Sequence, residues 1–503
     1  MSTAAEATGP GWLRIDPRTV LVTALVTAGV AFGAAVPAVA GLSGRLGYPA
    51  AIGWALAGAA LLIGCAAAGD YVRWRRTRYR VGGERVELHT GLLLVKRRSL
   101  ARERIRSVDL TADPLQRMLG LVAVRIGTGE QTGGESTLEL DPVTRAEGER
   151  LRRELLDRIA DASPGTHREG ELARLDPRWI RYAPVSFVAP MLGGAAAGGV
   201  MQISDWVGAQ GEVIDWVADR FRETPLVWAI IALVAAALVA GVVGALGLWI
   251  EMWWNYRLER EPGGTLRVRR GLLTARSLSV EERRLRGVDL VEPLGVRLAG
   301  AARVDAITTG LAKDEESQGT DHNTLLPATP RPFADAIAAE VLREPVPPTG
   351  APLTPHPSAA RGRRLRWSVA GVLAPVVVLA VLGVLLTPVL LWIALGCAVV
   401  GAPLAVAGAL DAYRSLGHTL SGTYLVTRSG SLRRSTAALQ REGVIGWTVR
   451  QSCFQRRAGL LSVTATTAAG AGAYTAYDTD ASEGLVFAAE AVPGLLEPFL
   501  DRS

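Results

Sequence analysis

The stretch LVWAIIALVAAALVAGVVGALGLWI at residues 226–250 contains no charged side chain, and the rest of the chain is interpreted outward from it. It is longer than the roughly 20 apolar residues that an α-helix needs to cross the hydrocarbon core of a bilayer. A helix of this length in a soluble protein would carry a polar stripe on its solvent-facing side, and this stretch has none. We therefore predict a transmembrane helix here.

Five further stretches are uncharged and of similar length, at residues 20–40, 50–69, 182–203, 367–387 and 389–410. Together with 226–250 they form three pairs, and a long polar region follows each pair. The sequence therefore predicts six transmembrane helices arranged as three hairpins. We expect hairpins at 20–69, 182–250 and 367–410, polar domains at 71–161, 254–344 and 418–501, and a linker rich in proline and arginine at 345–366.

The distribution of arginine predicts the orientation. Four arginines lie in residues 73–78, directly after the second predicted span, and four lie in residues 361–366, directly before the fifth. The loop between the first two spans has only Arg45, and residues 204–225 are acidic on balance. Because basic loops stay in the cytoplasm, we expect a multipass protein of the cell membrane with both termini and all three domains cytoplasmic.

Two features of the predicted hairpins leave alternatives open. Residues 204–225 place Trp206, Val213 and Val217 on one helical face, which favours a short helix on the outer surface, although a solvated loop fits equally well. Residues 14–40 resemble a signal peptide with a cleavage site. However, the sequence Ile-Asp-Pro-Arg at 15–18 recurs as Leu-Asp-Pro-Arg at 175–178, which favours the first span as half of a hairpin.

The composition argues against several functions. The net charge is +7 and the pI about 9.6, but lysine occurs only at positions 96 and 313, an arginine bias typical of a GC-rich genome. We therefore expect no nucleic-acid partner. The three cysteines and five histidines lack the spacing of metal ligands, and no nucleotide-binding loop or nucleophile motif is present. We expect no metal, no cofactor and no enzymatic activity.

The first two polar regions repeat the same short motifs in the same order. These are a tyrosine-led strand, a Gly-Leu-Leu turn, Arg-Ser-Leu, Val-Asp-Leu, Pro-Leu, and Arg-x-x-Gly, which begin at residues 79, 91, 98, 108, 114 and 117 and again at 256, 271, 276, 288, 293 and 297. The third region keeps Tyr424 and Arg456–Gly459 but lacks Val-Asp-Leu and Pro-Leu. Val86 and Leu88 alternate with polar residues, as in a half-buried strand.

Each region also ends in a stretch with helical periodicity, such as Leu151, Leu155, Leu156 and Ile159 in the first. Short strands followed by one amphipathic helix predict an α+β domain, a small β-barrel or sandwich closed by its C-terminal helix. This order of motifs resembles the bacterial pleckstrin-homology (PH) domain, in membrane proteins that carry a transmembrane hairpin before each domain. The resemblance implies a binding or scaffolding protein, and assembly with itself or with a smaller hairpin-plus-PH protein.

One group of basic residues is the best candidate for a binding surface. Lys96, Arg97, Arg98, Arg102, Arg104 and Arg106 lie about 20 residues or more into the first domain, farther than topology signals require. Each basic residue near an anionic surface contributes about 1 kcal/mol. We therefore predict that this group binds anionic lipid headgroups or a protein partner at the bilayer.

Transport is the alternative function, because six spans could form a pathway. Asp70, Glu251 and Asp411 lie only at span ends, while coupled transport usually needs ionisable groups within the membrane. Prolines inside the spans keep this alternative open. Glycines in the spans, at 29, 33, 194, 198, 241, 244 and 247, predict close helix packing, unless they reflect only the general Ala/Gly bias.

Overall fold

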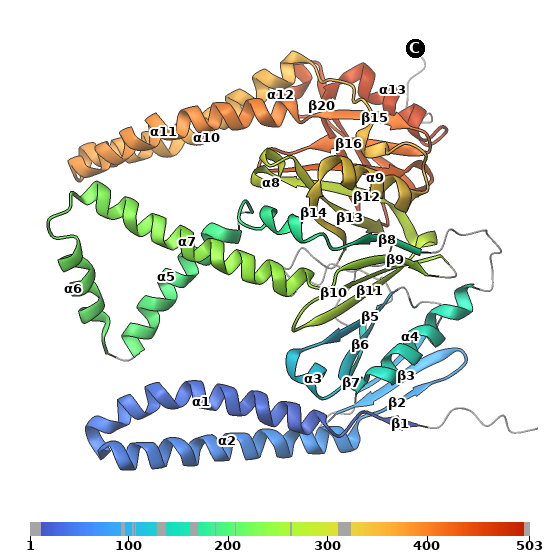
Figure 1. Cartoon of the computed structure of the whole chain (residues 1–503). Helices are drawn as coiled ribbons and strands as arrows, with labels where there is room; N and C mark the ends of the chain where they lie inside the picture. Colours follow the sequence, from blue (N-terminus) through green and yellow to red (C-terminus); the bar gives the residue numbers. More distant parts are fainter. Residues whose placement is uncertain are drawn as a thin grey trace, which may run out of the picture. The chain divides into compact units, whose positions relative to one another are not determined.

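Five long helices dominate the chain outside its sheets (Figure 1). They are α1 (Thr19–Leu46), α2 (Tyr48–Arg76), α7 (Leu226–Trp253), α10 (Ser358–Leu385) and α11 (Pro388–Arg414). Among the residues that the structure describes, these five are long and apolar enough to cross a membrane. The computed structural model describes residues 12–91, 96–102, 105, 107–127, 137–160, 170–186, 188–206, 208–261, 264–309 and 323–496.

The third predicted span differs from the other five. The chain forms a 3-10 turn, η2 (Pro177–Tyr182), and the helix α5 begins only at Val188 and ends at Trp206. Its 19 residues span about 28 Å at 1.5 Å per residue. Many of them are glycine or alanine, and Asp205 lies in the last turn. The prediction of six spans is therefore confirmed only for five. A short helix, α6 (Gln210–Arg220), follows with no buried residue, which confirms the helix predicted in 204–225.

Glycines hold α5 and α7 close together. A Cβ atom on Gly193 would lie 2.2 Å from the carbonyl oxygen of Ala237, and one on Gly241 would lie 2.0 Å from that of Ala189. Any larger residue at these two positions would push the helices apart. Gly241 and Gly244 were predicted to pack in this way and do so. In contrast, Gly29, Gly33, Gly194, Gly198 and Gly247 have no non-local atom within 4 Å, and Gly193 was not predicted.

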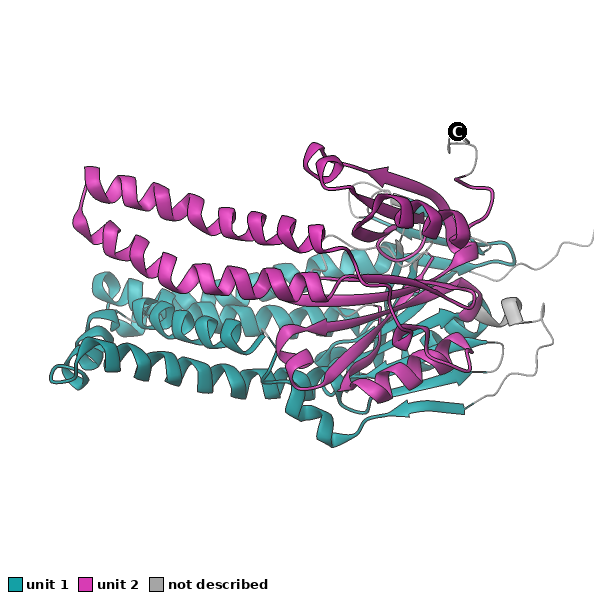
Figure 2. Ribbon diagram, turned by 90° about the horizontal axis from the view of Figure 1, so that it is seen from above, with its two compact units in different colours: residues 1–281, 312–315 teal, residues 282–311, 316–503 magenta. Residues whose placement is uncertain are grey.

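The chain divides into two compact units, residues 1–281 with 312–315 and residues 282–311 with 316–503 (Figure 2). In the first unit, a four-stranded sheet has the order β1-β2-β3-β4, and a seven-stranded sheet has the order β7-β6-β5-β11-β10-β9-β8. Its strands are β1 (Leu13–Arg14), β2 (Arg78–Val81), β3 (Arg85–Thr90), β4 (Lys96–Ala101), β5 (Ser107–Ala112), β6 (Leu121–Gly127), β7 (Thr137–Thr144), β8 (Gly170–Arg174), β9 (Arg257–Glu261), β10 (Thr265–Arg270) and β11 (Ala275–Glu281).

In the second unit, a six-stranded sheet has the order β14-β13-β12-β17-β16-β15, and a three-stranded sheet has the order β18-β19-β20. All pairs are antiparallel. The strands are β12 (Leu285–Pro293), β13 (Ala301–Thr308), β14 (Thr324–Pro330), β15 (Gly417–Ser421), β16 (Tyr424–Ser429), β17 (Arg433–Gln440), β18 (Val444–Arg450), β19 (Leu460–Thr467) and β20 (Ala473–Asp480).

We call each helical hairpin with the strands that follow it a module. In each module the last sheet is followed by a helix, namely α4 (Arg145–Ala160), α9 (Arg331–Leu342) or α13 (Ala481–Ala491). Leu151 and Leu155 of α4 are buried among Val108, Val124 and neighbouring strand residues, as the predicted helical face requires. The side chains of Leu156 and Ile159 lie outside the described residues. Shorter helices, α3 (Pro114–Met118), α8 (Leu294–Leu298) and α12 (Cys453–Arg457), follow the fourth strand of each module.

Two of the sheets contain strands from two different modules. We predicted a small barrel or sandwich in each module and no strand pairing between modules, but β11 of module 2 pairs with β5 of module 1, and β17 of module 3 pairs with β12 of module 2. Each of these sheets therefore runs from one module into the next. Local periodicity could not predict this, because it shows only which face of a strand is buried and says nothing about what pairs with its edge.

Candidate functional site

The two junctions between modules have the same geometry. We call β4, β11 and β17 the third strands, and β5, β12 and β18 the fourth strands, of their modules. Leu110 pairs with Ser277 at the first junction, and Leu290 pairs with Thr436 at the second. Ser277 and Thr436 each stand six residues after a turn glycine, Gly271 or Gly430. The register between consecutive modules is therefore repeated.

That register depends on a tight turn before each third strand. Gly271 and Gly430 have φ angles of 112° and 102°, which residues with a side chain rarely adopt. A Cβ atom would lie 1.9 Å from the carbonyl oxygen of Thr274 and 2.0 Å from that of Arg433. The same pairing across this turn is found in module 1, where Thr90 pairs with Lys96 around Gly91. These glycines therefore fix which third-strand residues face the junction.

An aspartate of each Val-Asp-Leu motif lies at each junction. One oxygen of Asp109 has no hydrogen-bond partner, and the backbone of Ser279 in module 2 hydrogen-bonds the carboxylate. Burial raises the pKa of Asp109 to about 7. Asp289 accepts a hydrogen bond of 2.5 Å from the Ser435 hydroxyl of module 3, and burial raises its pKa to about 6. Both carboxyl groups are thus held by the following module.

Arginine–glutamate pairs close the first junction. Arg152 of α4 donates to Glu261 of β9 at 2.8 Å, and Arg267 of β10 donates to Glu149 of α4 at 2.8 Å. Both arginine side chains are almost completely buried, with 5% and 3% exposed. Burial alone would raise the pKa of Glu149 and Glu261, but the hydrogen bonds and charges of these arginines lower it. The helix of module 1 is therefore fixed to the first strands of module 2.

The second junction is centred on one carboxylate. Glu292 of β12 is 1% exposed and accepts hydrogen bonds from Arg434 of module 3 and Arg331 of α9, at 2.7 and 2.8 Å. Burial alone would raise the pKa of Glu292, but these two arginines lower it. Arg297 of α8 also reaches Asp411, at the end of α11, at 2.7 Å. At the first junction the corresponding Arg117 donates to the backbone oxygen of Leu272 instead.

The predicted basic group lies on and beside β4. Arg97 is exposed, Arg98 and Arg102 are half-buried, and Arg102 donates to the backbone oxygen of Gly82 at 3.1 Å. The Lys96 side chain, Arg104 and Arg106 lie outside the described residues. The structure thus places Arg97 and Arg98 on a third strand and Arg102 directly after it, but their binding role stays a prediction.

The two end strands are the exposed counterparts of the buried junctions. Among the described strands, β4 pairs only with β3, and β18 pairs only with β19, so each has one edge without a partner strand. Ser99 of β4 is exposed, whereas its counterparts Ser279 and Ala438 are 1% and 0% exposed. Val449 of β18 is 41% exposed, whereas its counterparts Leu110 and Leu290 are 6% and 0% exposed.

A polar cluster links the third hairpin to its domain. Asp478 of β20 accepts from Arg363 of α10 at 2.6 Å and from Gln455 of α12 at 2.9 Å. Module 1 has a related pair, in which Gln116 donates to Asp141 at 3.0 Å. Module 2 has Val296 at the position of the glutamine. Sequence analysis did not predict this cluster, because Arg363 and Asp478 are 115 residues apart in the chain.

Two histidines that appeared scattered in the sequence meet in the second unit. His356 Nε2 and His418 Nδ1 are 3.0 Å apart, and burial lowers the pKa of both side chains, that of His418 to about 4. They therefore stay neutral and hydrogen-bonded at neutral pH. No group of three potential metal ligands occurs among the described residues. We interpret the pair as a structural contact that holds the linker against β15.

The carboxylates at the ends of the spans have structural partners. Asp70 accepts from Thr23 and Arg73, Glu251 accepts from the backbone amides of Leu273 and Thr274, and Asp411 accepts from Arg297. Each links a hairpin end to a neighbouring helix, turn or domain. These contacts give all three a role in packing, and they do not support the transport alternative.

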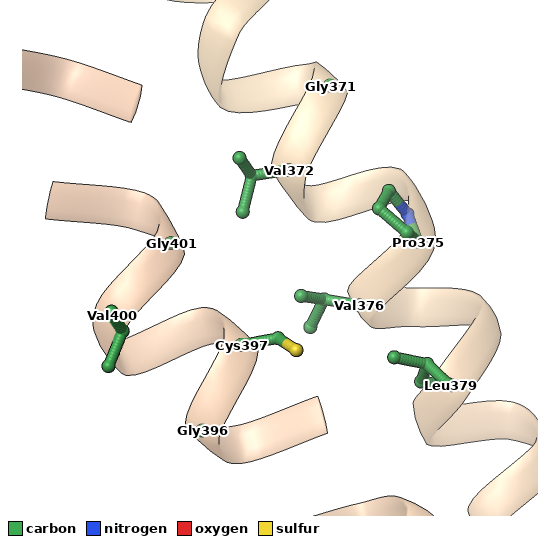
Figure 3. A pocket seen from close by; sticks show the side chains of 9 residues that line it. All are labelled: Gly371, Val372, Pro375, Val376, Leu379, Gly396, Cys397, Val400 and Gly401. Atoms are coloured by element: carbon green, nitrogen blue, oxygen red, sulfur yellow. The ribbon is translucent and has the colours of Figure 1, made fainter. Parts of the chain in front are cut away.

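A hollow of 460 Å³ lies between α10 and α11 (Figure 3). Pro375, Val376 and Leu379 of α10 face Gly396, Cys397 and Gly401 of α11 across it. Its lining residues carry no charge. A hollow of this kind at membrane depth suits an acyl chain or a neighbouring helix better than an ion, which needs polar ligands.

Comparison with known proteins agrees with this architecture. The sequence model of the Bacterial PH domain family matches three regions, residues 31–159, 209–345 and 369–489, one in each module. The UPF0699 transmembrane protein YdbT of Bacillus subtilis (strain 168) is 21% identical over 267 residues, which cover 50% of this chain and 53% of that protein. The match thus spans about half the length of that relative. No solved structure matches the chain. With three matched regions that together cover most of its length, this membrane protein belongs to the Bacterial PH domain family.

Proposed function

We propose that this protein is a non-enzymatic membrane scaffold that presents PH-like domains, joined by shared sheets, on the cytoplasmic side of the cell membrane. One observation carries the proposal: two sheets run from module to module in one repeated register. Buried ion pairs close both junctions, so module 1 is fixed to the first strands of module 2, and the later strands of module 2 are fixed to module 3. Such an arrangement suits holding a surface in place at the membrane.

The basic strand β4 is the proposed lipid-binding part of this surface. Arg97 is exposed on it, and Lys96 and Arg98 flank it in sequence. A strand edge rich in basic residues attracts an anionic bilayer surface, at about 1 kcal/mol per residue. The same charges would also prevent another strand from pairing with this edge. The two roles differ in one respect, because only lipid binding depends on the lipid headgroup.

The test uses the full chain in nanodiscs, because the first domain shares its sheet with module 2. The native cysteines are replaced, and a fluorophore is attached at Ser99→Cys or, as a control, at the exposed Ser482→Cys of α13. We expect spin-labelled headgroups to quench the Ser99 probe more strongly in anionic discs than in zwitterionic ones. At roughly 0.5 M salt, where screening acts within about 4–5 Å, the difference should disappear. Equal quenching in both lipids would refute lipid binding by β4.

The hollow in the third hairpin has an uncharged lining, and the carboxylates at the span ends have structural partners. Both observations favour a scaffold over a transporter.

The proposal also includes a sixth span, formed by α5, because α5 packs along α7 through Gly193 and Gly241. The cytoplasmic placement rests on the arginines that end α2 and begin α10. Accessibility of Cys453 and of a cysteine placed in α6 to a membrane-impermeant reagent in intact cells would test it. Labelling of Cys453 but not of α6 would contradict the orientation.

A further inference from the structure

The surface formed by β18 and α12 matches one side of a module junction, and no described strand pairs with its outer edge. We define this surface by Ile445 and Val449 of β18 and by Phe454 and Arg456 of α12. Ile445, Val449 and Phe454 are 64%, 41% and 60% exposed. At the two internal junctions Leu110 and Leu290 occupy the position of Val449, and both are buried where they pair with the third strand of the next module.

The backbone of module 3 preserves the geometry of the other fourth strands. Asp109, Asp289 and Thr448 each stand eleven residues before a glycine of positive φ, at Gly120, Gly300 and Gly459. Each of the three pairs with the residue five positions after that glycine, namely Arg125, Asp305 and Thr464. The fourth strand of module 3 is therefore built to the same register as the two that accept a partner strand.

The short helix beside it also keeps its connecting residue. Arg117 and Arg297, three residues before the same glycines, hold the next module through the Leu272 carbonyl and the Asp411 carboxylate. Arg456 occupies this position in α12 and is exposed. Module 3 thus presents both elements of a junction, a strand edge and an arginine, to whatever lies beyond it.

We propose that this surface binds the third strand of a PH-like module carried by a different polypeptide, by antiparallel strand addition in the register of the internal junctions. The inference rests on the proposed scaffold function and names the partner class. The partner would supply an uncharged or acidic residue opposite Arg450, and a carboxylate at the end of its hairpin for Arg456.

Charge argues against a second copy of this chain as the occupant. In the repeated register, Val449 would lie opposite Arg97, and Arg450 opposite Lys96. Like charges in directly opposed positions destabilise an antiparallel pair. In addition, the hairpin carboxylate of module 1, Asp70, is 8% exposed and already bound by Thr23 and Arg73. The basic β4 edge therefore blocks head-to-tail polymerisation, which heterologous contacts would otherwise permit.

A first experiment tests the competence of β18 with full-length chains as defined probes. One tagged chain carries Val449→Cys, and the second carries Lys96→Ser with Arg97→Cys, so that β4 resembles Ser435 and Thr436 of β17. All native cysteines are replaced. We expect at least tenfold more disulfide-linked dimer than with Val486→Cys, a matched exposed valine on α13. A yield equal to that of Val486→Cys would overturn the proposal. Equal linkage when Lys96 is retained would also overturn it, by making a second copy the occupant.

The second experiment identifies the natural occupant. The full chain, with p-benzoylphenylalanine at position 449 or at the control position 486, is photolysed in membranes of its native cells. We expect a cross-link from position 449 to a peptide in the third strand of another hairpin-plus-PH protein, and a several-fold loss of this cross-link with Arg456→Glu. A cross-link to another copy of this chain, to lipid alone or to a protein of another class would overturn the proposal. Failure here leaves lipid binding at β4, and its quenching test, unaffected.

Discussion

The two internal junctions share one backbone register but differ in how side chains close them. The first has three paired positions between β5 and β11 and adds four charged residues from α4, β9 and β10. The second has seven paired positions between β12 and β17 and concentrates its charge on Glu292. The register is thus set by the repeated turn and strand lengths. The side chains that close the two junctions differ. The substitutions below should therefore change the stability of the two junctions by unequal amounts.

The largest difference is expected between Glu292→Ala and Glu261→Ala. Removing Glu292 leaves Arg434 and Arg331 without their shared carboxylate, and breaking a buried pair typically costs about 3–5 kcal/mol of unfolding free energy. Glu261 is only partly buried, and Glu149 remains as a partner for both arginines, so its loss should cost less than half as much. Pulse proteolysis of the purified protein in detergent would measure both. Equal losses would contradict the description of the second junction.

Alanine substitutions at three equivalent fourth-strand positions compare the two internal junctions with the exposed edge of β18. Leu290→Ala and Leu110→Ala remove buried side chains and should cost about 2–5 kcal/mol each. Val449→Ala changes an exposed residue and should alter the stability of the purified chain by less than about 0.5 kcal/mol. Thermal unfolding of the three variants would check this order. A large effect of Val449→Ala in the purified chain would mean that β18 is already covered.

The junction aspartates predict a dependence of stability on pH. The pKa of Asp109 is about 7 in the folded protein and near 4 when unfolded, so the folded state binds the proton more tightly. Stability from this group is fully present below about pH 4 and is lost as the pH rises to about 7. Asp109→Asn should remove this loss and stabilise the protein at pH 8, by at most about 4 kcal/mol.

Asp289→Asn is the matched variant for this test. The Asp289 pKa of about 6 predicts a smaller gain at pH 8, and the asparagine amide oxygen accepts from the Ser435 hydroxyl less strongly than a carboxylate does. Melting temperatures between pH 5 and pH 8 would show both effects. If Asp109→Asn destabilises the protein equally at all pH values, then the aspartate is ionised in the folded state and our description of the first junction is wrong.

The smallest difference is expected between the connecting arginines. Arg297→Ala removes a bond to the carboxylate of Asp411 and should cost about 1–2 kcal/mol, because hydrogen bonds to charged groups are the stronger ones. Arg117→Ala removes a bond to a neutral carbonyl at an exposed site and should cost about 0.5 kcal/mol. Urea unfolding in detergent can resolve the two. Arg456→Ala should be neutral in the absence of a partner.

Part of this architecture could be predicted from the sequence alone. Uncharged runs identified the five long helices, and the recurring motifs around Gly91 and Gly271 identified the modules. The extension of sheets between modules was not predictable, since the pairing of a strand edge leaves no local pattern. The contact of His356 with His418 and the tight approach at Gly193 were missed for the same reason, because they join residues far apart in the chain. Lys96, Arg97 and Arg98 were identified as basic, but they were not predicted to lie on an edge strand.

Amide hydrogen exchange of the full chain in detergent or nanodiscs tests the shared sheets most directly. We predict slow exchange in Ala275–Glu281 and Arg433–Gln440, the third strands that pair on both sides. The amides of Lys96–Ala101 and Val444–Arg450 that face away from their sheets should exchange much faster. Equally fast exchange in all third strands would show that the modules are separate domains, and would contradict the account.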